Sequence, residues 1–210
     1  MVSLVFDCIE VRPDRYAAAP TMLFKIRLFE STGVKVHQAA LRCQMRIEPQ
    51  RRTYTDDEKA ALYDLFGEPS QWGDTLKPFQ LANLSYMIGG FTGNTDFEMP
   101  VQFSYDLEVA AGRYFNALAE GDIPLLLLFS GTVFVATENG FQVEPVPWDK
   151  ETSFRMPATV WREMIDLYFP GQGWLRLNRE TIDSLRRFKN ERGLSTWDIV
   201  VEALLKEAGQ

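Results

Sequence analysis

The feature that most constrains the fold is a two-residue alternation of apolar and polar side chains in the first fifty residues. Residues 4–8, 24–28 and 41–47 all follow it, with apolar side chains at every second position. The basic residues at the intervening positions are Lys25, Arg27, Arg42 and Arg46. Because successive side chains of a strand point to opposite faces, the pattern predicts an antiparallel sheet with one apolar face and one basic, solvated face.

The next segment contains a helix start and then loses its periodicity. Thr55 stands three residues before Glu58, which is the spacing of a capping box, and it predicts a short helix that ends at Gly67. Residues 68–96 are rich in Gly, Ser, Thr and Asn, so a long loop is expected there, with one strand near residues 81–88.

Strand patterns return in the middle of the chain. Residues 101–108 alternate with acid on the solvated face, and a short helix is expected at residues 114–118. Residues 123–129 form a continuous apolar run, typical of a strand that is buried on both faces. A bend or bulge is expected at Ser130-Gly131, and Asn139-Gly140 indicates a two-residue hairpin turn.

The C-terminal part is expected to be helical, because Pro157, Asn178 and Ser195 each precede an amphipathic segment. The sequence therefore predicts an α+β fold. Residues 1–150 would form an antiparallel β-sandwich-like domain with a short inserted helix, and residues 151–210 a helical segment packed on it.

The scarcity of reactive side chains excludes most catalytic sites. There is one histidine, His37, and there are two cysteines, Cys8 and Cys43. A Ser-His-Asp or Cys-His relay would have to use His37, and a site of two cysteines and two histidines for zinc lacks a histidine. The cysteines are expected on neighbouring strands as buried thiols, although a metal half-site completed by another subunit stays open. We expect no enzymatic activity, no metal and no cofactor.

The glycines and carboxylates do not change this expectation. Gly89, Gly90 and Gly93 are not followed by the lysine of a phosphate-binding loop. Carboxylates are numerous enough for a hydrolase pair, which remains a third class of function.

The charge distribution is uneven. The net charge is −7, yet residues 1–53 carry nine basic and five acidic residues, whereas residues 54–150 carry four and fifteen. This predicts surfaces of opposite sign. The N-terminus lacks a signal-peptide pattern, and the apolar run at 123–129 is too short to cross a membrane, so we expect a soluble cytoplasmic protein with reduced thiols.

The end of the chain resembles a ribbon-helix-helix module of bacterial DNA-binding repressors. Residues 174–178 alternate as a short strand, and two helical segments follow. The resemblance implies that Trp174, Arg176 and Asn178 face outward on the ribbon, and that Ser195 offers backbone amides to a phosphate. The other interpretation is that this segment packs on the β domain through Trp174 and Trp197.

A second resemblance covers nearly the whole chain. It rests on four stretches: Gln71-Trp72-Gly73, residues 124–134, residues 144–149 and Trp161-Arg162-Glu163. In these the chain is similar to a family of bacterial proteins of unknown function that is associated with gene clusters for nickel-iron uptake hydrogenases. The resemblance implies a chaperone-like assembly partner of a metalloenzyme.

Two functions follow as expectations. The first is an accessory protein that binds another protein, because tryptophan and arginine are over-represented in interface hot spots. The residues expected at that interface are Lys25, Arg27, Arg42, Arg46, Trp72 and Trp148. The alternative is a DNA-binding transcriptional regulator that uses Trp174, Arg176, Asn178 and Ser195.

Overall fold

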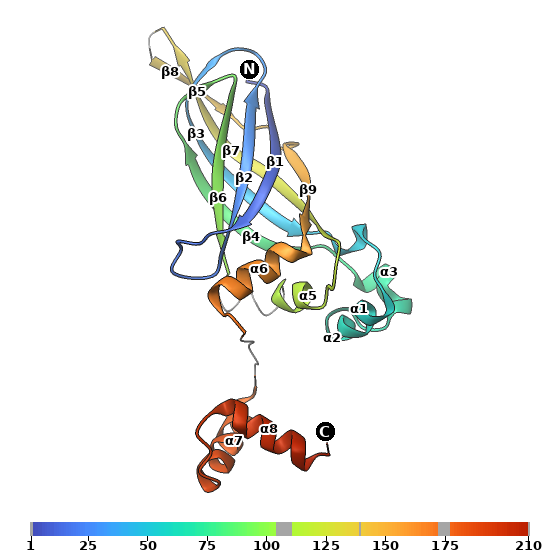
Figure 1. Cartoon of the computed structure of the whole chain (residues 1–210). Helices are drawn as coiled ribbons and strands as arrows, with labels where there is room; N and C mark the ends of the chain where they lie inside the picture. Colours follow the sequence, from blue (N-terminus) through green and yellow to red (C-terminus); the bar gives the residue numbers. More distant parts are fainter. Residues whose placement is uncertain (1, 104–110, 139, 172–176, 210) are drawn as a thin grey trace. The chain divides into compact units, whose positions relative to one another are not determined.

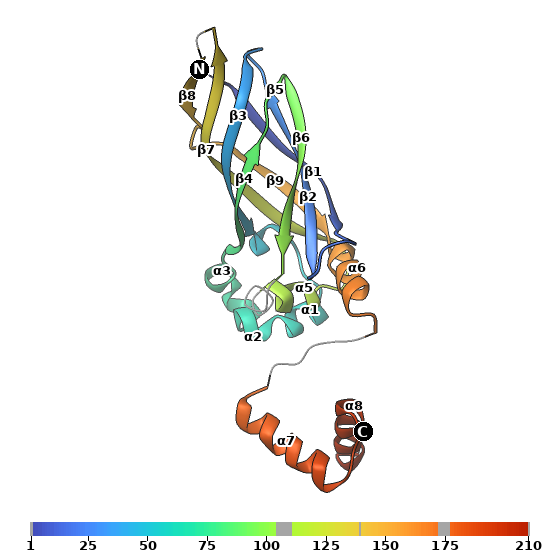
Figure 2. The same cartoon turned by 90° about the vertical axis from the view of Figure 1, so that its left-hand side faces the viewer.

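The computed structural model describes residues 2–103, 111–138, 140–171 and 177–209. Two antiparallel sheets lie face to face (Figures 1 and 2). One sheet has the strand order β1-β2-β6: β1 Leu4–Pro13, β2 Thr21–Glu30, β6 Asn94–Gln102. The other has the order β4-β3-β7-β8, with β5 beside β3 and β9 beside β7: β3 Lys35–Ile47, β4 Phe79–Ile88, β5 Phe91–Thr92, β7 Asp122–Thr137, β8 Gly140–Pro145, β9 Glu151–Pro157. The predicted α+β, sandwich-like fold is confirmed.

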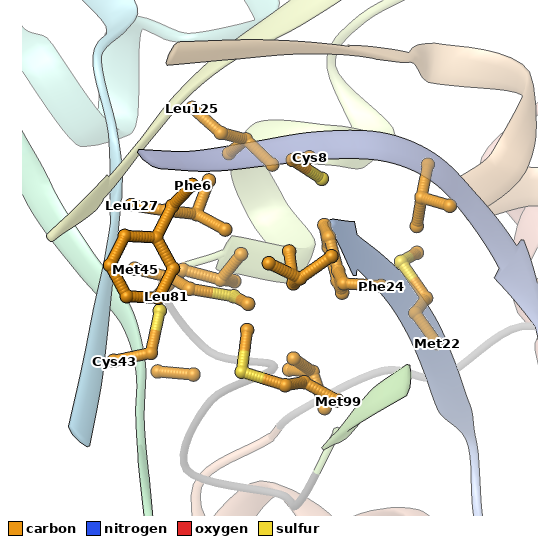
Figure 3. Packing of buried hydrophobic residues seen from close by; sticks show 14 of the residues in the cluster. Phe6, Cys8, Met22, Phe24, Cys43, Met45, Leu81, Met99, Leu125 and Leu127 are labelled. Atoms are coloured by element: carbon orange, nitrogen blue, oxygen red, sulfur yellow. The ribbon is translucent and has the colours of Figure 1, made fainter. Parts of the chain in front are cut away.

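The core fills the space between the two sheets (Figure 3). The Phe6 ring on β1 stacks on the Phe129 ring on β7, with centroids 4.1 Å apart, which joins the two layers. Cys8 and Cys43 are both buried, as predicted, but they come from opposite sheets and not from neighbouring strands. Alternation places a side chain on a face of its strand, whereas the assignment of strands to sheets depends on long-range pairing.

Strand β7 is the centre of the larger sheet, and it changes partner along its length. Residues 122–128 pair with β9, and residues 132–137 pair with β8. The change occurs around Gly131, whose φ is +140°, and a Cβ built there would lie 2.1 Å from the carbonyl oxygen of Ala40 on β3. The register between β7 and β3 is continuous through Gly131. At the site predicted to bend or bulge, β7 therefore changes the strand it pairs with on its other edge, and it has no bulge there.

Short helices gather at one end of the sandwich (Figure 1): η1 Pro49–Arg51, α1 Asp56–Ala61, α2 Tyr63–Phe66, η2 Pro69–Gln71, α3 Trp72–Thr75 and α5 Arg113–Asn116. The predicted capping box is confirmed, because Thr55 Oγ1 accepts from Glu58 N at 3.2 Å and Glu58 Oε2 accepts from Thr55 N at 3.0 Å. Glu58 Oε1 also accepts from Arg52 Nη2 at 2.9 Å and from Ala119 N at 3.2 Å. The side chains of Arg52 and Glu58 are only 9% and 4% exposed. This buried ion pair ties α1 to the segment that leads into β7.

The helix predicted from Pro157 to Pro170 is present as α6, Ala158–Tyr168. Its Trp161 is fully buried, and the indole Nε1 donates to Asn116 Oδ1 at 2.6 Å. This helix belongs to the same compact unit as the sheets, which extends to Pro170.

Several expected boundaries were wrong. The segment 68–96 is not a long loop with one strand, because it also holds η2, α3, β5 and the start of β6. The strand expected at 101–108 begins earlier, at Asn94; residues 104–108 lie outside the described residues. Strand β9 falls in the segment predicted to be helical, because β7 offers it a free edge. The two compact units therefore divide after residue 170 and not after residue 150.

The hairpin between β7 and β8 is also displaced by one residue from its prediction. Gly140 pairs with Thr137 and is the first residue of β8. Asn139, the other residue of the predicted turn, lies outside the part of the chain that the structure describes.

The second compact unit, residues 171–210, contains α7 Arg179–Glu191 and α8 Trp197–Glu207. An ion pair between Arg192 and Glu207 joins the helices, and Lys189 Nζ lies 6.0 Å from the centroid of the Trp197 ring. Val200 is the only described side chain of this unit that is buried.

Candidate functional site

The four basic residues predicted to share one solvated face lie on two different sheets. Lys25 and Arg27 belong to β2, whereas Arg42 and Arg46 belong to β3. The two sheets bury the faces that they turn toward each other, so their solvated faces point to opposite sides of the sandwich. The prediction of a single basic face is therefore wrong, because β2 and β3 carry the same alternation but join different sheets.

The basic residues on β2 are neutralised by acidic residues of their own sheet. Arg27 donates to Asp96 on β6 through Nε at 2.8 Å and Nη2 at 2.9 Å, and Lys25 Nζ lies 3.8 Å from the same carboxylate. Hydrogen bonding from Arg27 lowers the pKa of Asp96. On β1, Asp7 and Glu10 stand opposite Arg27 and Lys25. This face offers little uncompensated positive charge.

Arg42 stands in a different environment. Its register partners are Ser85 on β4 and Ser130 on β7, which are short and uncharged. Among the described residues, the Arg42 guanidinium has no ion pair and no hydrogen bond. Two open hollows of about 520 and 550 Å³ adjoin it, and Arg42, Ser85 and Ser130 line both of them. Arg42 is therefore a charged group that remains available to a ligand or partner.

Trp148 stands beside this arginine because the loop between β8 and β9 is fastened to β7 at both ends. Val146 N donates to Gly131 O at 2.9 Å, and Phe129 N donates to Lys150 O at 2.8 Å. The Trp148 side chain is 93% exposed and lines the first hollow. The change of partner in β7 thus positions this tryptophan.

Apolar side chains extend the same surface toward β8. Met87 lines the second hollow, and Phe141 and Val143 on β8 are exposed; register places them on the side of the sheet that carries Ser130 and Thr132. The His37 ring stacks on that of Phe141 with centroids 5.9 Å apart. We call this surface of the larger sheet the outer face, made of Arg42, Gln44, Asn83, Ser85, Met87, Ser130, Phe141, Val143 and Trp148.

Two other predicted interface residues have partners within the chain. Arg46 Nε lies 3.9 Å from Glu48 Oε1, and Arg51 Nε lies 3.4 Å from the other oxygen of this buried carboxylate. Trp72 is half-buried at the helical end, with its ring 5.2 Å from that of Tyr54, and its Nε1 donates to Gly67 O at 3.0 Å. Trp72 therefore packs among the short helices and does not belong to the outer face.

The thiols of both cysteines are buried away from solvent and from soluble reactants. Burial raises the pKa of both Cys8 and Cys43 to about 12, so the reactive thiolate is scarce at neutral pH. No group of three or more His, Cys, Asp or Glu side chains with a metal-binding arrangement occurs in the described parts of the chain.

The residues proposed for DNA binding are placed only in part. Trp174 and Arg176 lie outside the described residues. Asn178 is the N-cap residue of α7, as predicted, although its side chain makes no capping hydrogen bond. Ser195 does not begin α8, because the N-cap residue is Thr196, whose Oγ1 accepts from Ile199 N at 3.3 Å.

Sequence reasoning identified Arg42 and Trp148 but missed the residues that surround them. Ser85 and Asn83 lie in a segment without a clear pattern, and Phe141 was seen only as part of a hairpin. A signal for Ser130 was present, because it is the first polar residue after the apolar run at 123–129. Only the pairing of β4, β3 and β7 brings these residues together.

The geometry thus defines a class: an α+β protein with a two-sheet antiparallel sandwich whose larger sheet exposes Arg42 and Trp148 on its outer face. The chain belongs to the family described as "Family of unknown function (DUF6084)", which matches residues 1–210. The resemblance to a family of unknown function is thereby confirmed. No curated protein matches the chain.

Comparison with solved structures gives only distant similarities. β-Glucosidase 3B from Thermotoga neapolitana is 8% identical with a TM-score of 0.27, over 73% of this chain and 17% of the enzyme. For β-glucosidase from Kluyveromyces marxianus the identity is 4% and the TM-score 0.27, over 74% and 15%. A putative late embryogenesis abundant protein is 12% identical with a TM-score of 0.29, over 75% and 72%. The chain spans less than a fifth of either glucosidase, and none of these similarities bears on function.

None of the helices in the described residues has the length and apolar character required to traverse a membrane.

Proposed function

We propose that this protein is a non-enzymatic accessory protein that binds another protein through the outer face. The observation that carries the proposal is the Arg42 guanidinium, which has no ion pair or hydrogen bond within the described part of the chain and stands beside an exposed tryptophan and exposed apolar side chains. Arginine and tryptophan dominate interface hot spots, and apolar side chains around them exclude water from the contact.

The chemistry of the outer face also restricts the partner. A carboxylate is the natural partner of an unpaired guanidinium, which can hold it with two parallel hydrogen bonds. The hydroxyls of Ser85 and Ser130 flank that position and can add further hydrogen bonds. We propose a partner that presents an acidic residue among apolar ones. A subunit or assembly factor of a nickel-iron uptake hydrogenase is the first candidate, and the role would then be chaperone-like.

The proposal is tested by affinity capture followed by binding measurements with the purified partner. The bait is the full chain, in cells that express a hydrogenase gene cluster. We expect Arg42→Gln to weaken binding about tenfold or more, because a hot-spot arginine contributes more than about 1.4 kcal/mol. Trp148→Ala should have an effect of the same direction.

Arg27→Gln is the matched control, because it removes the same charge from the opposite side of the sandwich. It should leave the affinity within about twofold, since its effect is limited to long-range electrostatics. Absence of a stoichiometric partner, or equal losses for the Arg42 and Arg27 variants, would contradict the proposed function.

DNA binding by residues 171–210 is the second candidate, favoured by the fact that these residues form a compact unit of their own. Lys and Arg contacts to phosphates would make the affinity fall steeply with salt concentration. We expect a mobility shift that weakens as salt is raised and is lost in Arg176→Ala. A duplex that stays unbound even at about 50 mM salt, where phosphate contacts are strong, would exclude this candidate.

A further inference from the structure

A third hollow lies at the helical end of the larger sheet, and it shares no lining residue with the two hollows at Arg42. Its volume of about 600 Å³ falls in the range of roughly 300–1,000 Å³ that is usual for small-molecule sites. Three arginines line it, Arg51, Arg52 and Arg155, together with one acidic residue, Asp122. The hollow therefore combines the size of a ligand site with an excess of basic side chains in its lining.

Arg51 and Arg155 lie on the same side of the sheet although they are far apart in the sequence. On β9, Ser153 stands opposite Leu126 and Arg155 opposite Pro124. Side chains two positions apart on a strand share a face, so Ser153 and Arg155 point the same way. Arg51 Nη1 donates to Ser153 Oγ at 3.3 Å. This hydrogen bond brings the Arg51 guanidinium to the side of the sheet that carries Arg155.

Both guanidinium groups have donors to spare. Arg155 is exposed, and it makes no ion pair and no hydrogen bond within the described parts of the chain. Arg51 bonds Ser153 through Nη1 and lies 3.4 Å from Glu48 through Nε, whereas its Nη2 donates to no acceptor in those parts. The hydroxyl of Thr53, which also lines the hollow, has no hydrogen bond there either. Several polar groups around one hollow are thus available to a ligand.

Arg52 has a different part, because it holds the backbone on two sides of the hollow. Its Nε donates to Thr53 O at 3.2 Å, its Nη1 to Asp122 O at 3.3 Å, and its Nη2 to Glu120 O at 3.3 Å. Its charge is balanced by the buried carboxylate of Glu58. The side chain of Glu120 does not line the hollow. Arg52 therefore keeps the shape of the site and leaves anion binding to Arg51 and Arg155.

The acidic groups around the hollow do not cancel its positive charge. Glu48 is buried, and its single carboxylate is shared by Arg46 at 3.9 Å and Arg51 at 3.4 Å. Asp122 lies within 4.0 Å of no basic group among the residues that the structure describes. One positive charge remains in excess when the charged side chains are counted: Arg46, Arg51, Arg52 and Arg155 against Glu48, Glu58 and Asp122. This excess favours an anionic ligand.

We propose that this hollow binds the phosphate group of a small molecule between the guanidinium groups of Arg51 and Arg155. The planar fork of an arginine matches the oxygen atoms of a phosphate, and two arginines can hold its two negative charges. The Thr53 hydroxyl adds a donor that carries no charge. Asp122 opposes the bound anion, so its replacement has an effect of predictable sign. This site is independent of the protein partner proposed for the outer face.

The test is a titration of the full chain with glycerol 3-phosphate at constant ionic strength, followed by the NMR signals of the arginine Nε–H groups. We expect saturable shifts of the Arg51 and Arg155 signals, with a dissociation constant on the order of 1 mM. Arg155→Gln should weaken binding at least about fivefold, and Asp122→Asn should tighten it about twofold, because a like charge is removed. Inorganic phosphate is the second probe. An equal affinity assigns recognition to the phosphate group alone, and a lower one assigns it to the ester.

Arg27→Gln is the control, because it removes the same charge from the opposite side of the sandwich and should change the affinity less than about twofold. Raising the pH from about 5.5 to about 7.5 should strengthen binding about threefold, since a phosphate monoester loses its second proton near pH 6. His37, the one histidine, lies near the start of β3, whereas Arg51 follows its end. Absence of a saturable shift up to about 50 mM ligand, or equal affinities of the Arg155 and Arg27 variants, would overturn the proposal.

Discussion

Replacement of Glu58 by alanine is expected to lower the free energy of unfolding of the β-sandwich by about 3–5 kcal/mol. The carboxylate is almost fully buried and accepts hydrogen bonds from Arg52 and from the backbone amides of Thr55 and Ala119. Its removal leaves a buried guanidinium without a counter-charge and two amides without an acceptor. Breaking such a pair costs more than the pair contributes, because the remaining charge is not resolvated.

Urea denaturation followed by tryptophan fluorescence measures this effect, with the buried Trp161 as a reporter. Asp56→Ala is the control on the same helix, because Asp56 pairs with Lys59 at an exposed site and should leave the midpoint unchanged. Simultaneous replacement of Arg52 by Met and Glu58 by Leu should recover part of the loss, since no charge is then left buried. Equal midpoints for Glu58→Ala and Asp56→Ala would show that the buried pair has no special role.

Gly131→Ala is expected to destabilise the sandwich by about 3 kcal/mol or more, as backbone strain and overpacking each cost roughly 1–3 kcal/mol. The φ of +140° disfavours any residue with a Cβ, and the added atom would lie 2.1 Å from the carbonyl oxygen of Ala40. The clash is with the backbone of the adjacent strand and cannot be relieved by a side-chain rotation. The loop that carries Trp148 is attached at this residue, so binding by the outer face should weaken as well.

Gly140→Ala separates the two causes. Gly140 has nearly the same φ, +139°, but a Cβ there meets no atom within 4 Å. It should therefore cost only the conformational strain, about 1–3 kcal/mol. Thermal unfolding of both variants gives the difference, which measures the clash. A Gly131 variant no less stable than the Gly140 variant would mean that β3 and β7 separate easily at this point.

Local signals in the sequence predicted individual elements well. The capping box of Thr55 and Glu58, the alternation of β1 to β3, the buried run in β7 and the helix after Pro157 all occur as expected. Each depends on contacts between residues close in sequence or on the periodicity of one element. Among the missed elements, β5 and β9 are strands whose conformation depends on the edge that a distant strand offers.

The candidate site shows the same limit. Arg27 and Arg42 occupy equivalent positions in alternating strands, and the sequence gives no means of telling them apart. Pairing decides the difference: β6 brings Asp96 to Arg27, whereas β4 and β7 bring serines to Arg42. Whether a charged side chain is already paired or can bind a partner depends on the residues opposite it on the neighbouring strands.

The sequence by itself determined which residues are apolar on one face, where helices begin, and that reactive side chains are scarce, because these properties are local. The tertiary structure alone decided which strands share a sheet, that Asp96 pairs with Arg27 while Arg42 has no ion pair among the described residues, and where the compact units divide. These features depend on hydrogen bonds and packing between segments far apart in the chain, such as β7 with β3 and β9. The free energy of such an interaction depends on both segments and cannot be read from the sequence of either one alone.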